Sequence, residues 1–260
     1  MKLSIQHLTL RLENRVIVDD LSLDVDHREI VGLVGESGSG KSMTATSVLG
    51  LAPRLGFAVG GSITLDGTEL VGASEHELRE IRGRRIAMIF QSPSGAFNPV
   101  MRVGEVFERT LRLHGVAGDE VAARAARSCE EVLLPALVLR RYPHQLSGGQ
   151  LQRVAIALAL ALDAEVLLAD EPTSALDVTV QAEILSLLTT LRGRGMAILL
   201  ITHDLGVVAQ VADRVAVMRA GQLVEVGPTR QVLDHPRDPY TQTLLAAVPR
   251  LSAGTGGHDA

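Results

Sequence analysis

Gly35-Glu36-Ser37-Gly38-Ser39-Gly40-Lys41-Ser42 is the stretch that decides the fold of this chain. The spacing of Gly35, Gly40 and Lys41-Ser42 is the pattern of a phosphate-binding loop, whose glycines let backbone N–H groups turn towards phosphates. The apolar run Ile30 to Val34 predicts a buried strand before the loop, and a helix is predicted from Lys41 to about Leu51. The N-terminus of that helix adds positive potential at the phosphates. The sequence therefore predicts a nucleotide site formed by Gly35, Glu36, Ser37, Gly38, Ser39, Gly40, Lys41, Ser42 and Met43.

Two acidic residues follow another apolar run that is typical of a buried strand. Asp170 comes directly after the run Val166 to Ala169, and Glu171 is next. Ligands of open α/β sheets bind at the carboxyl ends of the strands, so Asp170 is placed to hold Mg²⁺ together with the Ser42 hydroxyl. Glu171 is the candidate general base for an attacking water. Lys41 is expected to reach the β- and γ-phosphates.

The order of elements along the rest of the chain predicts the architecture. Apolar runs that alternate with helical stretches argue for a mainly parallel sheet with helices on both faces. Alternation of apolar and polar residues before Ile30 indicates antiparallel strands with one solvent-exposed face. Ser74 and Glu77 have the spacing of a capping box, which predicts a short helix, and Ala197 to Thr202 is predicted to be a strand. From about residue 92 to 153 the sequence has a helical character after a loop that contains Pro93. We therefore expect one nucleotide-binding domain over residues 1–250, with the helical part inserted into it, and a flexible tail at 251–260.

The composition limits the class of protein. The chain has 260 residues, of which 46% are hydrophobic, and its formal charge of −5 does not favour nucleic acid as a partner. The one cysteine, Cys129, excludes an internal disulfide and is expected to pack as a small apolar residue. No signal peptide is visible, and the longest apolar run, Val154 to Leu162, is far shorter than the about 20 residues of a membrane span. We expect a cytosolic protein; if it acts on a membrane, it does so by docking to other chains.

Further motifs connect the phosphate loop to a known family. Leu146-Ser147-Gly148-Gly149-Gln150 is similar to the signature motif of ABC-type ATPases. Gln91, the turn Ser174 to Asp177 and His203 resemble further motifs of the same family. From about Leu3 to Val248 the chain resembles an ABC nucleotide-binding domain. The resemblance implies an ABC-type P-loop α/β fold with a RecA-like core, an antiparallel β subdomain and an inserted helical subdomain. It also implies ATP and Mg²⁺ as cofactors.

The resemblance implies a role for each of these residues as well. The helix start at 147–150 would bind the γ-phosphate of ATP held by the opposite subunit, through Ser147, Gly148, Gly149 and Gln150. Gln91 would sense the γ-phosphate, ligate Mg²⁺ and relay to the helical insert. His203 would bond the γ-phosphate and keep Glu171 productive. Asp177 would lie at the dimer interface and couple the two ATP sites.

Three stretches narrow the resemblance to the oligopeptide, dipeptide and nickel importers. They are Phe90-Gln91-Ser92-Pro93, Ala96-Phe97-Asn98-Pro99 and His235-Pro236-Arg237-Asp238-Pro239-Tyr240-Thr241-Gln242. The short chain and the sequence Gln150-Leu151-Gln152-Arg153 are nearer to the nickel or metallophore type.

Two positions depart from the family pattern. Leu12 stands in place of the adenine-stacking aromatic, which leaves the affinity for ATP open, and Arg28 stands where a turn glycine is common.

Together these features predict the ATP-binding and ATP-hydrolysing subunit of an ABC importer. It would lie peripherally at the cytoplasmic face of the cell membrane and energise uptake of oligopeptides, dipeptides or a nickel or metal chelate. Its helical insert would grip two transmembrane permease subunits. Its other partners would be a second related ATPase or a second copy of itself and, indirectly, an extracellular solute-binding protein, with no nucleic acid.

Other readings of the same motifs stay open. A soluble ABC ATPase of DNA repair or translation would share the nucleotide core, but the long coiled-coil insertion or second cassette of such proteins is not seen in the sequence. A subunit that binds ATP without hydrolysing it is disfavoured by Glu171 and His203. The sequence does not choose between peptide and metal cargo, or between a homodimer and a heterodimer.

Overall fold

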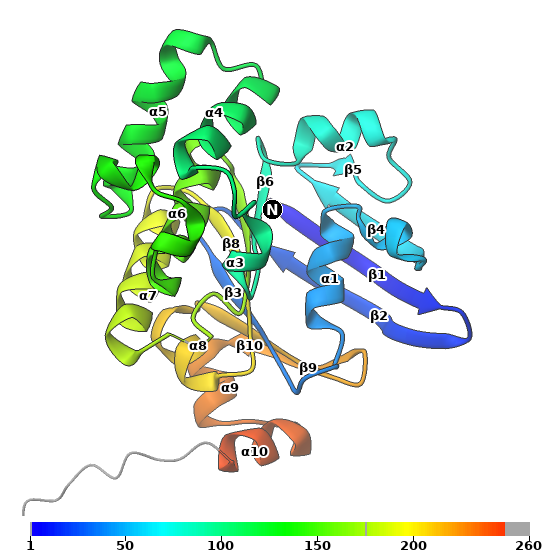
Figure 1. Cartoon of the computed structure of the whole chain (residues 1–260). Helices are drawn as coiled ribbons and strands as arrows, with labels where there is room; N and C mark the ends of the chain where they lie inside the picture. The colour runs from blue at the N-terminus through cyan, green and yellow to red at the C-terminus, as the bar shows by residue number, and fades with distance from the viewer. Residues whose placement is uncertain (1, 175, 248–260) are drawn as a thin grey trace, which may run out of the picture.

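The computed structural model describes residues 2–174 and 176–247, which form two sheets surrounded by helices (Figure 1). A four-stranded sheet has the order β2-β1-β4-β5, and a six-stranded sheet has the order β10-β9-β3-β8-β7-β6. The strands are β1 (Leu3–Leu12), β2 (Arg15–Val25), β3 (Ile30–Val34), β4 (Ala58–Leu65), β5 (Thr68–Glu69), β6 (Ile86–Ile89), β7 (Val166–Asp170), β8 (Ala197–Thr202), β9 (Arg214–Arg219) and β10 (Gln222–Pro228). The α-helices are α1 (Lys41–Val48), α2 (Glu75–Ile81), α3 (Pro93–Ala96), α4 (Val103–Leu113), α5 (Gly118–Glu131), α6 (Gly148–Ala161), α7 (Val178–Gly193), α8 (Leu205–Val211), α9 (Thr229–Asp234) and α10 (Pro239–Ala246).

The six-stranded sheet carries the nucleotide-binding motifs. Strands β6, β7, β8, β3 and β9 run parallel to one another, and β10 returns antiparallel to β9. Every residue of β3, β7 and β8 is buried. Successive residues of β8 face different cores, because Ile198 and Leu200 pack with α6 and α7, whereas Leu199 packs with α1 and the four-stranded sheet. Burial on both faces is what the uninterrupted apolar runs predicted.

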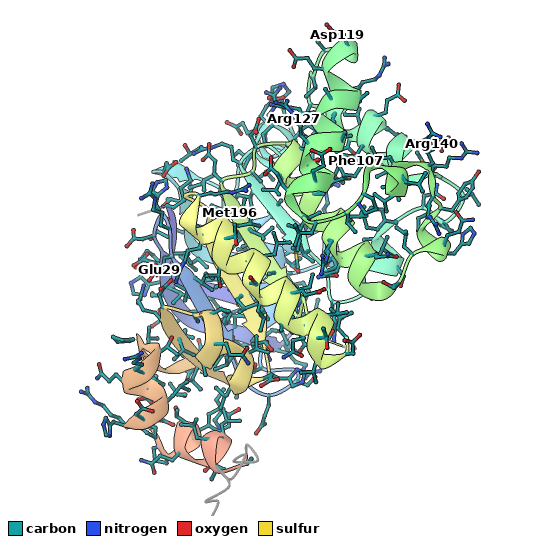
Figure 2. All side chains as sticks on the ribbon, turned by 90° about the vertical axis from the view of Figure 1, so that its left-hand side faces the viewer. Glu29, Phe107, Asp119, Arg127, Arg140 and Met196 are labelled. Atoms are coloured by element: carbon teal, nitrogen blue, oxygen red, sulfur yellow. The ribbon has the colours of Figure 1, made fainter. Side chains whose placement is uncertain are left out.

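A helical segment between β6 and α6 stands apart from the sheets, and Asp119, Arg127 and Arg140 mark it in Figure 2. Its helices α4 and α5 pack against α6 in a core that includes the fully buried Phe107. Cys129 is buried in the same core, and burial raises the pKa of its thiol to about 11. The thiol therefore stays protonated and unreactive at neutral pH, as the apolar packing predicted for it requires.

Several local signals predicted their elements correctly. Ser74 accepts the backbone N–H of Glu77, and Glu77 accepts that of Ser74, so the predicted capping box begins α2. Strands β3 and β8 have the predicted limits. Pro93 lies in a predicted loop but begins the short helix α3, because proline lacks only an N–H that a helix start leaves unsatisfied anyway.

The C-terminal elements were not predicted. α9 and α10 are short and separated by Pro236 and Pro239, so no helical periodicity is long enough to reveal them. None of the described helices is both long and apolar enough to cross a bilayer. The expected tail at 251–260 lies outside the described residues, and the proposed limits of the domain stay a prediction.

Candidate nucleotide-binding site

The loop between β3 and α1 surrounds the amino group of its own lysine. Lys41 donates from Nζ to the carbonyl oxygens of Gly35 and Glu36, both at 2.8 Å. Burial lowers the pKa of this ammonium group, while the carboxylates of Glu171, Asp170 and Glu36 act in the opposite direction. Phosphate oxygens are charged acceptors and form stronger hydrogen bonds than carbonyls. The ammonium group of Lys41 is therefore held where phosphate oxygens of a bound triphosphate could replace the two carbonyl oxygens as its acceptors.

The first residue of the loop rests directly on strand β9. At Gly35 a Cβ atom would lie 2.1 Å from the carbonyl oxygen of Met218, and φ is +154°. Only glycine permits this approach without moving backbone. The sheet thus decides where the loop begins.

Ser42 and Asp170 meet beside the loop, at the predicted cation site. Ser42 donates from Oγ to Asp170 Oδ1 at 3.1 Å. Burial raises the pKa of the Asp170 carboxyl and Glu171 adds to the rise, whereas the Ser42 hydrogen bond and Lys41 oppose it. The hydroxyl, the carboxylate and the amide oxygen of Gln91 are the hard oxygen donors that Mg²⁺ prefers, so the residues present fit this ion.

Glu171 is held by two of the residues predicted to act with it. Gln91 donates from Nε2 to one carboxylate oxygen at 3.0 Å, and His203 Nδ1 lies 2.8 Å from the other. The backbone of Glu171 is left-handed, with φ 46°, and its N–H donates to the carbonyl oxygen of Ile201 at 2.8 Å. A glutamate rarely adopts this conformation, and such strain collects at functional sites. The turn after β7 thus aims the carboxylate between Gln91 and His203.

One pocket of ≈ 230 Å³ brings together part of the predicted site. Its lining residues are Ile17, Ser37, Gly38, Gly40, Lys41, Ser42, Met43, Gln91 and Glu171. Of these, Ile17 was not selected from the sequence, because the apolar alternation of β2 carries no sign of contact with a ligand. Leu12 ends β1 opposite Arg15 and is not part of this lining.

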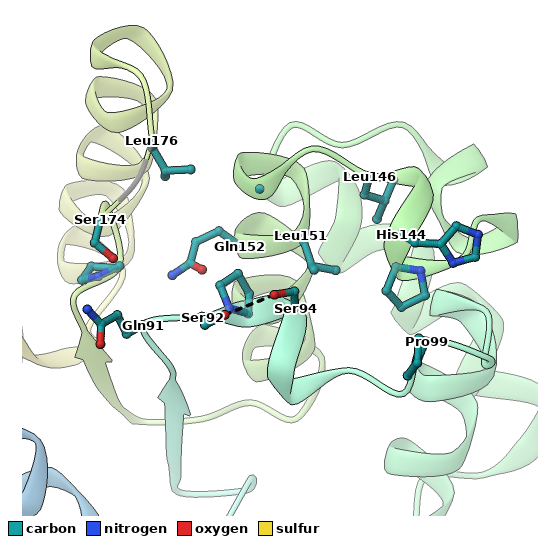
Figure 3. Close-up of a pocket in the computed structure, with 14 residues that line it drawn as sticks. Gln91, Ser92, Ser94, Pro99, His144, Leu146, Leu151, Gln152, Ser174 and Leu176 are labelled. Atoms are coloured by element: carbon teal, nitrogen blue, oxygen red, sulfur yellow. Dashed lines mark hydrogen bonds between the residues drawn. The ribbon is translucent and has the colours of Figure 1, made fainter.

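The signature motif lies away from this pocket. Gln91 also lines a second pocket of ≈ 370 Å³, and Figure 3 shows Leu151 and Gln152 of α6 across from Gln91 and Ser174. Among the described residues, neither 147–150 nor Asp177 lines the ≈ 230 Å³ pocket. The chain therefore does not bring its signature motif to its own phosphate loop.

The motif residues instead build helix starts. Ser147 Oγ accepts from the N–H of Gln150 at 3.2 Å, and Gln150 Oε1 accepts from the N–H of Ser147 at 3.1 Å. Asp177 Oδ1 accepts from the N–H of Val180 at 3.0 Å. These caps orient the N-termini of α6 and α7, where backbone N–H groups attract anions.

A second residue of the site was missed by the sequence analysis. This residue is Tyr240, whose hydroxyl accepts a hydrogen bond from the N–H of Glu36 at 3.3 Å. Tyr240 lies 204 residues after Glu36 in the chain. The only signal was its place in the stretch His235 to Gln242, which was used as a family marker.

The sequence matches described families in two places. Residues 18–174 match the family described as "ABC transporter", and residues 224–259 match the "Oligopeptide/dipeptide transporter, C-terminal region".

Individual relatives and solved structures agree with this. A putative peptide import ATP-binding protein of Brucella abortus is 50% identical over 238 residues, covering 90% of this chain and 72% of the relative. The glutathione import ATP-binding protein GsiA of Salmonella typhimurium is 48% identical over 249 residues, covering 92% of this chain and 40% of the relative. The dimeric bacterial ABC transporter cassette MJ0796 has a TM-score of 0.75 at 29% identity, over 88% of this chain and 99% of that one. The structure of cbiO1 from Clostridium perfringens has a TM-score of 0.78 at 25% identity, over 90% of each chain.

Proposed function

Because this chain belongs to the ABC transporter family, whose ATP-binding subunits are ATPases, we propose that it powers the import of small peptides. The observation that carries the ATP-hydrolysing part of the proposal is the meeting of Gln91, Glu171 and His203 beside the phosphate loop. It joins a base, its two positioning partners and a phosphate cradle in one site.

The residues of the site divide the work of hydrolysis. Lys41 and the backbone N–H groups of the loop bind and orient the phosphates. Glu171 accepts one hydrogen bond from Gln91 and contacts His203. Its carboxylate would thereby be directed at the attacking water and would accept a proton from that water. Ser42, Asp170 and Gln91 would hold Mg²⁺, which would neutralise charge on the phosphates when bound.

A second subunit completes each site in this proposal. The helix start at Ser147 to Gln150 is built to receive an anion, yet it does not line the pocket of its own chain. In a head-to-tail pair it would reach the γ-phosphate bound by the partner, and Asp177 would lie beside it at the interface. ATP would then lie between the two subunits and hold them together, and hydrolysis would allow them to separate.

The helical segment is the part proposed to contact the membrane proteins. It stands out from the sheets between β6, which leads to Gln91, and α6, which begins with the signature motif. Movement of this segment would therefore couple both nucleotide contacts to two permease subunits. The chain would lie peripherally on the cytoplasmic side of the membrane.

Peptides are the proposed cargo. The support is the match of residues 224–259 to the oligopeptide/dipeptide C-terminal region and the peptide and glutathione names of relatives near 50% identity. A nickel or metal chelate is the second cargo to test, since the wording at Gln150 to Arg153 favours it.

Transport by the purified assembly tests the proposal. The chain is captured from native membranes in mild detergent, its partners are identified by mass spectrometry, and the assembly is placed in liposomes with its binding protein and ATP on the side of this subunit. ATP-dependent uptake of a labelled dipeptide, lost in Glu171→Gln, is expected. Uptake of a nickel chelate alone would replace the cargo class. Purely soluble partners of repair or translation would remove the transporter role and favour the other class of ABC ATPase.

A further inference from the structure

A helix near the C-terminal end of the described residues touches the phosphate loop. α10 contacts β10, which is an edge strand of the six-stranded sheet, and Figure 1 shows it at the bottom of the molecule. The residue that makes the contact is Tyr240, which is 7% exposed.

Tyr240 and Lys41 hold two sides of one peptide group. The N–H of Glu36 donates to the Tyr240 hydroxyl at 3.3 Å, and the carbonyl oxygen of Gly35 accepts from Lys41 Nζ at 2.8 Å. Both atoms belong to the peptide between Gly35 and Glu36. Because a peptide group is planar, a rotation that breaks one of these bonds also displaces the other.

The ring of Tyr240 is fixed from several directions. It packs in an apolar cluster with Val34, the last residue of β3, and with Val217 of β9. The guanidinium of Arg219 lies over the ring, 4.9 Å from its centre. Burial raises the pKa of the phenol, so the hydroxyl remains neutral at physiological pH and meets the N–H as an uncharged group.

The backbone around Tyr240 is equally constrained. Its N–H donates to Oδ1 of Asp238, which caps α10, at 2.8 Å. The carboxylate of Glu225 in β10 accepts the N–H groups of Arg237 at 2.9 Å and Asp238 at 3.1 Å. These hydrogen bonds fix the backbone of Tyr240 relative to the sheet. The position of the hydroxyl is therefore set by the backbone as well as by the packing of the ring.

We propose that Tyr240 is a positioning residue for ATP, whose hydroxyl holds the Gly35–Glu36 peptide in the orientation in which Lys41 and the loop receive the phosphates. The C-terminal segment thereby sets the affinity for ATP without touching the nucleotide. This inference rests on the proposed phosphate-binding role of Lys41 and the loop, so the two are tested separately.

The decisive variant is Tyr240→Phe in the full chain, with ATP as the probe. Phenylalanine keeps the ring and its contact with Arg219 and removes only the hydroxyl. We expect the dissociation constant for ATP to rise about threefold to tenfold, because an N–H of the loop loses its partner. The rate at saturating ATP should change by less than about twofold, and the melting temperature by less than about 2 °C, since the packing is kept.

Tyr142→Phe is the matched control. Tyr142 is the other tyrosine of the chain and also lies beneath an arginine, with the guanidinium of Arg102 5.5 Å from its ring centre, but it belongs to the helical segment. Its variant should bind ATP like the original chain. An unchanged dissociation constant in Tyr240→Phe, or an equal rise in Tyr142→Phe, would overturn the inference.

Two further variants keep the test decisive. Arg219→Gln removes the cation from the ring face and keeps the hydroxyl, so a smaller rise of about twofold in the dissociation constant is expected. If it shows no rise in a folded chain, the ring contact has no part in positioning. Lys41→Ala tests the phosphate site itself. Loss of ATP binding there together with an unaffected Tyr240→Phe refutes only the positioning role, whereas undiminished binding in Lys41→Ala removes the proposed site.

Discussion

Substituting Gly149 tests whether the signature motif needs glycine for packing or for its ligand. A Cβ atom at this position would lie 2.3 Å from Cγ1 of Val180, the first-turn residue of α7, and 3.6 Å from its Cβ. An ordinary carbon–carbon contact is about 3.5 to 4 Å, so Val180 or the start of α6 has to move by more than about 1 Å. Valine has a stiff side chain, which makes this movement costly.

The magnitudes follow from that single contact. Overpacking costs about 1 to 3 kcal/mol, and alanine returns at most about 1 kcal/mol of helix propensity, so Gly149→Ala should lower the free energy of unfolding by about 1 kcal/mol. Val180→Ala removes half-buried methyl groups and should cost about 1 kcal/mol. In the double variant the clash is gone, because the Cβ of residue 180 is already at an ordinary distance. The pair should therefore be more stable than the sum of the single changes by about 1 to 2 kcal/mol.

Urea unfolding of the four chains measures this coupling, and ATP hydrolysis by the same chains separates the two roles. Additive effects on stability would refute the packing argument. If the double variant regains stability but hydrolyses ATP slowly, Gly149 is needed for close approach to the γ-phosphate of the partner site. Recovery of both would reduce Gly149 to a packing residue.

Three other substitutions, and a fourth that serves as a control, have expected outcomes. Glu171→Gln should slow ATP hydrolysis by at least about 100-fold while labelled ATP still binds, and an undiminished rate would exclude Glu171 as the base. Asp170→Asn should stabilise the nucleotide-free chain by about 1 kcal/mol at pH 7, because it removes a buried charge whose carboxyl pKa is raised. Since a raised folded-state pKa makes the wild type gain stability as the pH falls towards it, urea unfolding should show this advantage shrinking as the pH is lowered from 7 towards the ordinary aspartate pKa of about 4. An advantage independent of pH would contradict the assignment. Arg28→Gly should stabilise the chain by about 0.5 kcal/mol, because Arg28 is left-handed with φ 58°, a strain of about 1 to 2 kcal/mol that outweighs the about 0.5 to 1 kcal/mol entropic cost of glycine. Arg15→Gly, in strand β2, should destabilise it, and equal effects of the two glycines on the urea midpoint would refute the argument.

Arg28 also shows which features of the fold can be predicted from residues close together in the chain. The family pattern predicts a turn glycine there, and the left-handed backbone of Arg28 is the physical reason for it. The phosphate loop, the apolar strands β3 and β8 and the capping box at Ser74 are local in the same sense. Their conformations depend on residues a few positions apart, so their patterns were sufficient to predict them.

The sequence by itself thus determined the phosphate cradle, the buried parallel strands and the identity of the candidate base, Glu171. Only the tertiary structure decided which groups meet there. Gln91 and His203 reach Glu171 because β6 and β8 flank β7 in the sheet. Tyr240 reaches Glu36 because α10 packs against β10 and the tyrosine ring packs with Val217 of β9. Contacts between residues far apart in the chain leave no periodicity in it, since they are set by strand order and packing, which local patterns do not encode.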